Sequence, residues 1–565
     1  ITQIISIDKV NGDTVFAYAN PQELKDIQSL GYDLNMLPHP TSLVKSRGMA
    51  TTIDEMANWN KYPTYEVYRA MMKKFEQDYP NLCKLDSIGT SVNGRKLYVV
   101  KISNNVLDDE PELEFFYTST MHGDETTGFV LMLRLIDYLL VNYEVDERVT
   151  NLVDNIAIYI NPNANPDGTY KGGNHTVDGS VRYNANGYDV NRNFPDPRIG
   201  ENPNGPYQPE TLAMMEFAES RNFVLSANFH GGIELANYPW DSWTSSTNPH
   251  ADHNWYYTIS REYADLAQAN SPSGYFTGMN NGVTHGGDWY VISGGRQDYM
   301  NYWHHCREIT LEISNTKNPS SDLLPNFWNY NFESMMSFIE TLSTGIKGTV
   351  TNSLGQPLSA TITIDGHDKY NTFVVTNPEH GNYIRMIEPG TWELTYASEG
   401  YISQVHTITI DDYTSSFTND VVLEEAGITN LHGIVTDAET ENPIEGVRIQ
   451  LLNTSITDAY TDAQGNYSFS EIPEGLYHVN VSKENYISVT VVETLEGDNN
   501  TLDFILNPSD PVDFEINIPD GFTFSGGSWT RDNTYAFAGA YSLKSATISH
   551  NQKTSTEISL NIVSE

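Results

Sequence analysis

Residues 113–143 decide the fold of the chain and read LEFFYTSTMHGDETTGFVLMLRLIDYLLVNY. The stretch begins with a run of apolar and β-prone side chains, Leu113–Thr118, which is typical of a buried strand. A short polar turn follows, and Thr126–Tyr143 then places apolar residues at helical spacing. These residues are Phe129, Leu133, Ile136 and Leu140. A strand that leads directly into such a helix predicts an α/β architecture.

The same alternation of strands and helices continues over residues 56–343. Further strands are expected at Ile156–Ile160, Phe223–Phe229 and Glu308–Ile313. We therefore predict an α/β domain whose mixed, mostly parallel sheet is flanked by helices. Residues 1–55 hold too little strand and helix to bury a core of their own, so we interpret them as a possible remnant of a pro-segment.

Short alternating strands separated by Gly, Pro and Asn replace this pattern after Thr344. The run Gly348–Thr351 recurs as Gly433–Thr436, an offset of 85 positions. The triplet Gly381–Tyr383 recurs as Gly465–Tyr467, an offset of 84 positions. An internal repeat of this length predicts two tandem copies of one β-domain.

We assign the tandem all-β sandwich domains to residues 344–425 and 426–508. The remaining residues, 509–565, hold too few strands for an independent sandwich. We interpret them as the start of a truncated, jelly-roll-like β-domain.

Charge and composition exclude several classes of protein. The 565 residues include 31 Lys and Arg against 74 Asp and Glu, a formal net charge of −43. This charge repels nucleic acid and anionic lipid, so neither is an expected partner. No apolar run approaches the ~20 residues that span a bilayer, so membrane insertion is not expected. The chain has two cysteines, Cys83 and Cys306, and their spacing leaves open whether they form a disulfide.

Candidate metal ligands follow two of the expected strands. His122 and Glu125 lie in the turn after the first strand, and His230 directly follows Phe223–Phe229. Because ligands of open α/β sheets bind beyond the carboxyl ends of strands, we expect these side chains to converge. Two histidines and one carboxylate form a catalytic zinc set that leaves one position open. Taken alone, a His-x-x-Glu motif is more often a pair of polar residues at a helix start.

Five motifs in a fixed order carry a family resemblance. They are HGDE at 122–125, NPDG at 165–168, DVNRNFP at 189–195, NFHGG at 228–232 and ITLE at 309–312. Together they resemble the zinc metallocarboxypeptidases, in the branch that includes carboxypeptidases N, E and D. The resemblance implies one bound Zn²⁺ and hydrolysis of the C-terminal peptide bond of peptides and proteins. Both β-domains resemble the transthyretin-like, carboxypeptidase regulatory-like domains of that branch.

The resemblance also implies a role for each matched residue. His122, Glu125 and His230 are the implied zinc ligands. Glu312 is the implied general base and acid, and Arg182 stabilises the developing oxyanion. Asp189 is implied to orient a ligand imidazole, and Asn191 and Arg192 are implied to bind the terminal carboxylate. Tyr290 is implied to close over the substrate. Asp241 and Gln297 are implied to form the pocket for the last side chain.

The implied pocket predicts which C-terminal residue is removed. A buried Asp241 would pair with Lys or Arg and leave an apolar side chain facing an unpaired charge. Plainer interpretations stay open: Asp241 as a solvated loop residue, Asp189 as a turn residue and Tyr290 as a core residue. Ile233 and Glu234 depart from the small polar residues of close relatives, so the subsites beyond the terminal residue are not defined by the resemblance.

Two other functions compete with the peptidase. The first is a catalytically silent peptide-binding or adhesion module of the same fold, although no zinc ligand or base is missing. The second is surface attachment through the C-terminal region. We expect a secreted or cell-surface enzyme of bacterial type that acts as a monomer. Calcium is possible at Asp437–Glu441, but a solvated turn explains those residues better.

Overall fold

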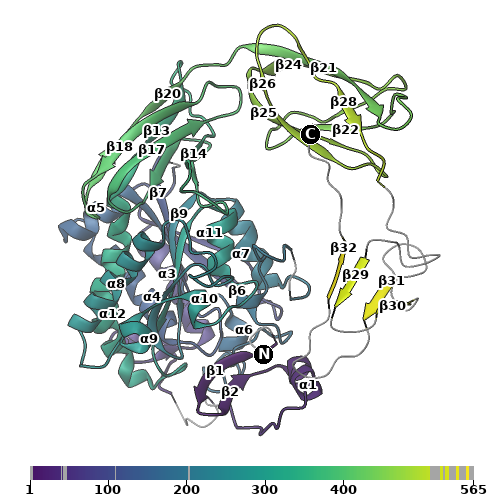
Figure 1. Cartoon of the computed structure of the whole chain (residues 1–565). Helices are drawn as coiled ribbons and strands as arrows, with labels where there is room; N and C mark the ends of the chain where they lie inside the picture. Colours follow the sequence, from purple (N-terminus) through teal and green to yellow (C-terminus); the bar gives the residue numbers. More distant parts are fainter. Residues whose placement is uncertain are drawn as a thin grey trace. The chain divides into compact units, whose positions relative to one another are not determined.

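A computed structural model describes residues 4–39, 41, 47–108, 110–201 and 204–509 (Figure 1). Four further strands are described beyond them: β29 (Phe522–Ser525), β30 (Trp529–Asp532), β31 (Ser542–Ser545) and β32 (Ser555–Ile558). Strand β29 pairs with β32 and β30 pairs with β31, both antiparallel. The predicted jelly-roll-like domain otherwise lies outside the described residues.

The chain forms two compact units. The first holds the residues up to Ser398 together with Ile402–Glu424, and the second holds Glu399–Tyr401 and the residues from Glu425 onward. The α/β domain and the first β-sandwich therefore belong to one unit, and the second β-sandwich belongs to the other.

An N-terminal hairpin and helix precede the α/β domain. Strand β1 (Ser6–Asn11) pairs antiparallel with β2 (Thr14–Tyr18), and helix α1 (Pro21–Ser29) follows. The Asn20 side chain caps α1 by accepting hydrogen bonds from the main-chain N–H groups of the first turn. Beyond it, β3 (Met49–Ala50) pairs in parallel with β4 (Tyr62–Pro63).

An eight-stranded sheet forms the centre of the first unit. Its strands follow the order β11-β10-β12-β9-β7-β8-β6-β5. Four neighbouring pairs are parallel and three are antiparallel, which confirms the predicted mixed, mostly parallel sheet. In chain order the strands are β5 (Cys83–Thr90), β6 (Lys96–Ile102), β7 (Leu113–Ser119), β8 (Ile156–Asn161), β9 (Phe223–His230), β10 (Glu234–Tyr238), β11 (Val283–His285) and β12 (Arg307–Ile313).

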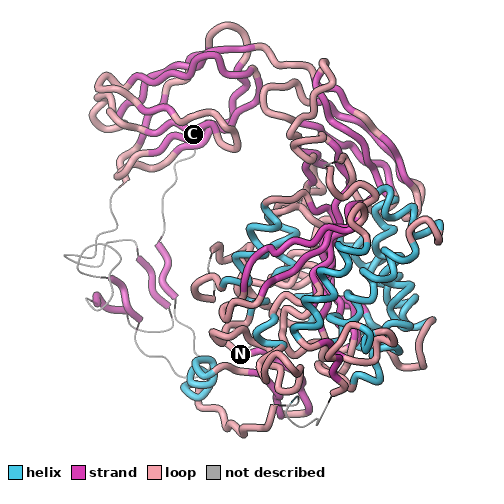
Figure 2. Tube along the Cα trace, turned by 180° about the vertical axis from the view of Figure 1, so that it is seen from behind, coloured by secondary structure: helices cyan, strands magenta, loops and turns pink. Residues whose placement is uncertain are grey.

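Helices cover both faces of this sheet (Figures 1 and 2). One core contains side chains of α3, α4, α5, α8 and α12, and a second core contains side chains of α7 and α11. Alternate residues of β7 enter opposite cores, Phe115 and Tyr117 on one face and Phe116 on the other, which explains why this strand is apolar throughout. The helices are α3 (Tyr65–Asp78), α4 (Thr127–Asn142), α5 (Glu147–Asn155), α6 (Pro166–Thr169), α7 (Pro209–Glu219), α8 (His253–Ala269), α9 (Gly278–Gly282), α10 (Gly286–Trp289), α11 (Arg296–Trp303) and α12 (Leu324–Glu340).

Two β-sandwiches with the same strand order follow. In the first, β16-β13-β19 faces β15-β14-β17-β18, and β20 also pairs with β13. In the second, β24-β21-β27 faces β23-β22-β25-β26, and β28 also pairs with β21. The strand order is the same in both sandwiches, so the predicted internal repeat is present in the topology. The strands are β13 (Gly345–Asn352), β14 (Thr361–Ile364), β15 (Val374–Val375), β16 (Asn382–Arg385), β17 (Gly390–Ala397), β18 (Gln404–Ile410), β19 (Ser416–Thr418), β20 (Val421–Leu423), β21 (Ile428–Asp437), β22 (Arg448–Leu451), β23 (Ala459–Tyr460), β24 (Asn466–Pro473), β25 (Gly475–Ser482), β26 (Val489–Leu495), β27 (Asn500–Thr501) and β28 (Phe504–Leu506).

A buried cluster of charges joins the first sandwich to the α/β domain. Arg385 of β16 and Arg307 of β12 each donate to Oδ2 of Asp252 at 2.7 Å. His367 lies 3.0 Å from the other oxygen, Oδ1. Burial alone would raise the pKa of Asp252, but the two guanidinium groups hold it well below its usual range. We call these four residues the Asp252 cluster.

The two cysteines do not form a disulfide. Cys83 and Cys306 are both free and buried. Burial raises the pKa of the Cys83 thiol to about 12, so it remains protonated at neutral pH.

Candidate metal centre and active site

The sheet brings the predicted site residues together at strand ends. His230 is the last residue of β9, and its register partner on β12 is Glu312. Strand β7 lies on the other side of β9, and the loop that carries His122 and Glu125 follows it. The carboxyl ends of three parallel neighbours therefore meet at one edge of the sheet.

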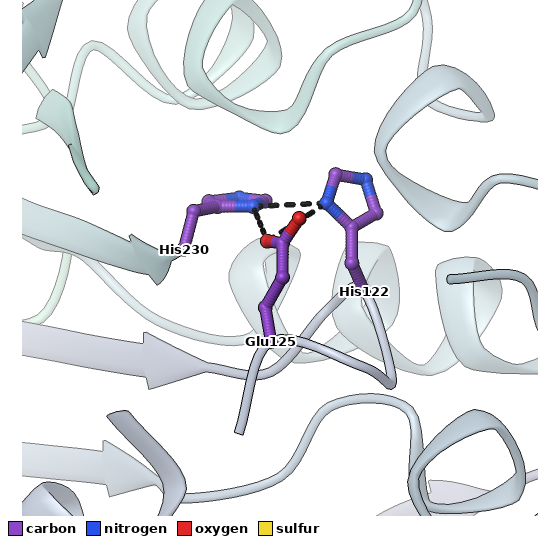
Figure 3. A group of neighbouring side chains, drawn as sticks. All are labelled: His122, Glu125 and His230. Carbon is purple, nitrogen blue, oxygen red and sulfur yellow. Dashed lines mark hydrogen bonds and ion pairs between the residues drawn. The ribbon is translucent and has the colours of Figure 1, made fainter. Parts of the chain in front are cut away.

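His122, Glu125 and His230 converge on one point (Figure 3). Oε2 of Glu125 lies 3.0 Å from His122 Nδ1 and 2.7 Å from His230 Nδ1. The two Nδ1 atoms are 3.1 Å apart. All three side chains are buried, and among the described residues they form the one group of at least three His, Cys, Asp or Glu that could hold a metal ion. We call them the metal triad.

The chemistry of the triad fits a zinc ion. Two ring nitrogens that face each other at 3.1 Å need a proton or a cation between them. Burial lowers the pKa of His230 to about 4, so this imidazole is neutral at physiological pH, as a metal ligand must be. Neutral imidazoles and a carboxylate are preferred ligands of Zn²⁺. The protein therefore takes zinc as its cofactor at these residues.

Each histidine of the triad has a polar partner on its other ring nitrogen. Nε2 of His122 lies 3.0 Å from Oδ1 of Asp189, and Nε2 of His230 lies 2.8 Å from the side-chain amide of Asn228. Such contacts fix the orientation of ligand imidazoles. The contact of Asp189 agrees with its implied role. Asn228 was missed, although it precedes His230 by two positions and so lies on the same face of β9.

Arg182 lies beside the triad. Its Nε donates to Oδ2 of Asp189 at 2.8 Å, and its Nη1 lies 3.0 Å from His122 Nδ1. Oε1 of Glu125 is 3.5 Å from the same Nη1. The guanidinium is therefore held next to the predicted metal position by a buried carboxylate.

The NPDG motif connects the metal-binding turn to the segment that carries Arg182. The side chain of Asn165 donates to the main-chain oxygens of Met121 and Arg182, both at 3.2 Å. This bond pair ties the metal-binding turn to the segment that carries Arg182. A Cβ atom at Gly123 would lie 2.3 Å from the main chain of Gly168, so the metal-binding turn can approach Gly168 this closely only with glycine at position 123.

Lys317 also contacts the metal centre, and it was missed at the level of sequence. Its Nζ donates to Oε1 of Glu125 at 2.6 Å and to the main-chain oxygen of Gly231 at 3.2 Å. Burial alone would lower the pKa of Lys317, but the carboxylates of Glu125 and Asp124 raise it, so the ammonium stays charged. A single Lys in a polar loop after β12 offers no pattern that would have predicted these contacts.

A cavity opens onto the triad. Nine of the eleven predicted site residues line it: His122, Glu125, Arg182, Asn191, Arg192, His230, Asp241, Tyr290 and Glu312. The other two predicted residues contact this set: Asp189 bonds to His122 and Arg182, and Gln297 donates to Oδ1 of Asp241 at 3.2 Å. The structure thus brings all eleven together.

Asp241 lines the cavity and is buried. Its Oδ1 accepts a hydrogen bond from the side chain of Asn237 at 3.1 Å. A Cβ atom at Gly286 would lie 1.9 Å from the same oxygen, so only glycine leaves space there. Burial raises the pKa of Asp241 to about 6. Asn237 and Gly286 were not predicted, because nothing in the sequence links them to Asp241.

The residues implied to bind a carboxylate lie in a short helical turn. Val190–Arg192 form this turn, and the Asp189 side chain caps it by accepting from Asn191 N. Oδ1 of Asn191 accepts a hydrogen bond from the main chain of Arg296 at 2.9 Å. The guanidinium of Arg192 donates to the Asn191 carbonyl at 2.8 Å and lines the cavity.

The Asp437–Glu441 turn satisfies its own carboxylate. Oδ1 of Asp437 accepts from the main-chain N–H groups of Glu439 and Thr440 at 2.9 and 2.8 Å. Oδ2 accepts from the hydroxyl of Tyr486 at 2.7 Å. These bonds favour a capped turn over the calcium site considered above.

Comparison with known proteins identifies the family. Residues 68–334 match the zinc carboxypeptidase family, and residues 430–507 match the carboxypeptidase regulatory-like domain. The chain is 36% identical to carboxypeptidase M of Mus musculus over 371 residues, which cover 63% of this chain and 82% of that protein. It is 34% identical to the carboxypeptidase N catalytic chain of Rattus norvegicus over 388 residues, 62% of this chain and 83% of that one. It is also 36% identical to carboxypeptidase D of Homo sapiens, of which it spans 26%.

The chain belongs to the zinc carboxypeptidase family and is a zinc metallocarboxypeptidase. The regulatory-like assignment of the second sandwich is confirmed by its family match. Within the described part of the chain, no helix is both long and apolar enough to cross a membrane.

Proposed function

We propose that this metallocarboxypeptidase removes Lys or Arg from the C-termini of peptides and proteins. The observation that carries the proposal is the buried carboxylate of Asp241 in the wall of the cavity, next to Gly286 and within hydrogen-bond distance of Gln297. An apolar terminal side chain would leave this carboxylate unpaired, whereas an ammonium or guanidinium would pair with it. The charge of the pocket therefore favours a basic terminal side chain.

Two residues hold the other end of the terminal amino acid. Arg192 and Asn191 line the same cavity, and a guanidinium matches a carboxylate geometrically. We infer that they bind the free α-carboxylate and thereby restrict cleavage to chain ends. Tyr290 lines the cavity at the end of α10 and is placed to cover the bound residue.

The chemical step needs a base and a stabiliser of negative charge. Zinc, when bound, polarises the scissile carbonyl and lowers the pKa of water. Glu312 faces the cavity beside His230, where it can take a proton from the attacking water and return it to the leaving amine. Arg182, held by Asp189, is placed to stabilise the oxyanion that develops next to the metal.

The cellular context of this activity is inferred from the sequence. We infer a secreted or cell-surface enzyme that acts as a monomer on soluble chain ends. The two tandem domains are inferred to be of the transthyretin-like type. A silent binding module of the same fold is disfavoured, because the metal triad and Glu312 are all present around one cavity.

Matched short peptides test the proposal. Peptides that differ only in a C-terminal Arg, Lys, Phe or Ala are compared by kcat/KM, with and without a zinc chelator. We expect Arg and Lys to exceed Phe and Ala by at least about tenfold, and the chelator to remove all release. A preference for Phe would contradict the role of Asp241, and release that persists in the chelator would contradict the metal mechanism.

A further inference from the structure

Two residues of the N-terminal hairpin line the active-site cavity. Ile7 of β1 and Tyr18 of β2 share this cavity with the metal triad. Both lie outside residues 68–334, the part of the chain that matches the zinc carboxypeptidase family. The hairpin therefore adds a surface to the site that the family match does not account for.

Tyr18 lies beside the metal centre. Nζ of Lys317 is 5.0 Å from the centre of the Tyr18 ring, and the same ammonium contacts Glu125 and Gly231. Asp241 has different neighbours, Asn237 and Gln297 among them. Because the proposed reaction puts the terminal side chain at Asp241, we assign the residue before the scissile bond to the wall that holds Tyr18, which we call the upstream wall.

The segment that carries Tyr18 is anchored beside the metal centre. The hydroxyl of Tyr183 donates to Oε2 of Glu23 at 2.9 Å, and the Asn20 side chain donates to a carbonyl of the same loop at 3.0 Å. Nε2 of His39 lies 3.5 Å from the fully buried carboxylate of Asp124, which belongs to the metal-binding turn. The His39 ring also lies 5.3 Å from the Tyr18 ring. These contacts anchor the segment that follows Tyr18 to the metal-binding turn and to the loop that carries Tyr183.

Ile7 and Tyr18 are part of the wall of the cavity that contains the metal triad. Whether the hairpin obstructs the site or forms a subsite is decided by the substrate comparison below.

We propose that Ile7 and Tyr18, together with Ile233, form a subsite that selects an apolar side chain at the residue before the scissile bond. The inference rests on the proposed carboxypeptidase function and extends it to the penultimate residue of the substrate. All three side chains are apolar or aromatic, and they line one cavity. Burial of an apolar substrate side chain against them is favourable because it removes apolar surface from water.

Charge at the upstream wall points to the same substrate class. The Lys317 ammonium lies 5.0 Å from the centre of the Tyr18 ring and donates to Glu125 and Gly231. It would repel a basic penultimate residue. Ile233, a departure from small polar residues noted in the sequence, then acquires a function in this wall.

The test compares peptides that all end in Arg and carry Leu, Phe, Gly or Lys at the penultimate position. For the wild-type protein we expect kcat/KM for Leu and Phe to exceed that for Gly by about tenfold. Tyr18→Ser is expected to lower the Leu and Phe values about tenfold and leave the Gly value within twofold. The preference for C-terminal Arg over Ala should not change in this variant, because Asp241 is untouched.

A matched control and a second measurement complete the experiment. Tyr32→Ser makes the same chemical change in the same segment at an exposed residue, and it should alter none of the ratios. The same peptides are also titrated onto the Glu312→Gln protein, with and without Tyr18→Ser. Their equilibrium affinities give the Leu-to-Gly ratio without turnover, so a failure of the proposed reaction is distinguished from a failure of the subsite.

Two results would overturn the inference. An unchanged Leu-to-Gly ratio in Tyr18→Ser, in both turnover and binding, would show that the hairpin does not contact the penultimate side chain. An equal rise of kcat/KM for every peptide would show that the hairpin obstructs the cavity instead of forming a subsite.

Discussion

Two buried groups of charged side chains in this protein have opposite arrangements. In the Asp252 cluster, each carboxylate oxygen faces a donor, and Arg307 and Arg385 contact it at 2.7 Å. In the metal triad, the Nδ1 atoms of His122 and His230 face each other at 3.1 Å. The first group pairs its carboxylate with cationic side chains of the chain itself, whereas the second brings three potential metal ligands within reach of one ion. Buried charge alone therefore does not identify a functional site, but the convergence of metal-ligating atoms does.

The surroundings of the two groups support this distinction. The triad opens onto a cavity, whereas Asp252 is fully buried between the α/β domain and the first sandwich. The second sandwich has no such cluster at the equivalent place. Its residue at the position of Arg385, 84 residues later, is Phe469, which packs into the core of that sandwich. One copy of the repeat thus uses an ion pair where the other uses an aromatic ring.

The largest expected effect comes from removing the base beside the triad. Glu312→Gln should lower kcat about 10³-fold, because general acid–base catalysis contributes on that order. The zinc content should stay at the wild-type level, since Glu312 is not a member of the triad. Steady-state kinetics and metal analysis of the same preparation check both parts. A variant that keeps a tenth of the wild-type kcat would reject the role of Glu312.

Removing a cation from the Asp252 cluster should lower stability and leave catalysis unchanged. Arg385→Met leaves the buried Asp252 with one guanidinium fewer and is expected to cost about 3 kcal/mol of unfolding free energy. Below the unfolding transition, kcat/KM should remain within twofold of wild type. Denaturant titration followed by activity measurement tests both statements.

Arg448→Met in the second sandwich is the matched control. Its ion pair with Asp458 is partly exposed, so the loss should be below about 1 kcal/mol. Equal losses for the two arginine variants would mean that the Asp252 cluster does not stabilise the docking of the first sandwich.

A third prediction concerns the buried acid of the cavity. Asp241→Asn should lower kcat/KM for a peptide ending in Arg by about 10- to 100-fold, because the basic side chain loses its counter-charge. The kcat/KM value for a peptide ending in Ala should stay within a few fold of the wild-type value. The ratio of the two substrates is the measurement. A parallel loss for both substrates would show that Asp241 supports the fold of the cavity and does not discriminate.

The smallest effect is expected from pH. Because burial raises the pKa of Asp241 to about 6, this carboxylate is charged above that pH and becomes neutral as the pH falls below it. KM for C-terminal Arg should therefore rise as the pH drops from 7 to 5, and KM for C-terminal Ala should not show this rise. Asp241→Asn should remove the difference between the two profiles. Identical profiles for Arg and Ala in the wild type would contradict this assignment.

Residues that carry a local pattern could be predicted from the sequence. Strand β7 and helix α4 follow from hydrophobic periodicity, and the metal triad follows from polar residues placed after strands. The eleven predicted site residues came from motifs, and the structure gathers them around one cavity. Their individual roles in binding and catalysis, and the domain boundaries, stay predictions.

Residues that act through distant contacts could not be predicted. Lys317 reaches Glu125 across 192 positions, and Gly286 approaches Asp241 because two loops pack together. The contact of the N-terminal hairpin with the cavity is of the same kind, since nothing in residues 1–55 indicates what they cover. Tertiary packing sets these contacts, and packing leaves no periodic signal in the chain.

Zinc titration combined with peptide hydrolysis tests the central claim most directly. Metal-free protein is prepared with a chelator, zinc is added back in steps, and release of C-terminal Arg from a short peptide is followed for wild type and for His230→Ala. The account predicts no activity without metal, full recovery at one zinc per chain, and neither tight zinc binding nor recovery in the variant. Release of Arg by the metal-free wild type, or wild-type zinc affinity in His230→Ala, would contradict it.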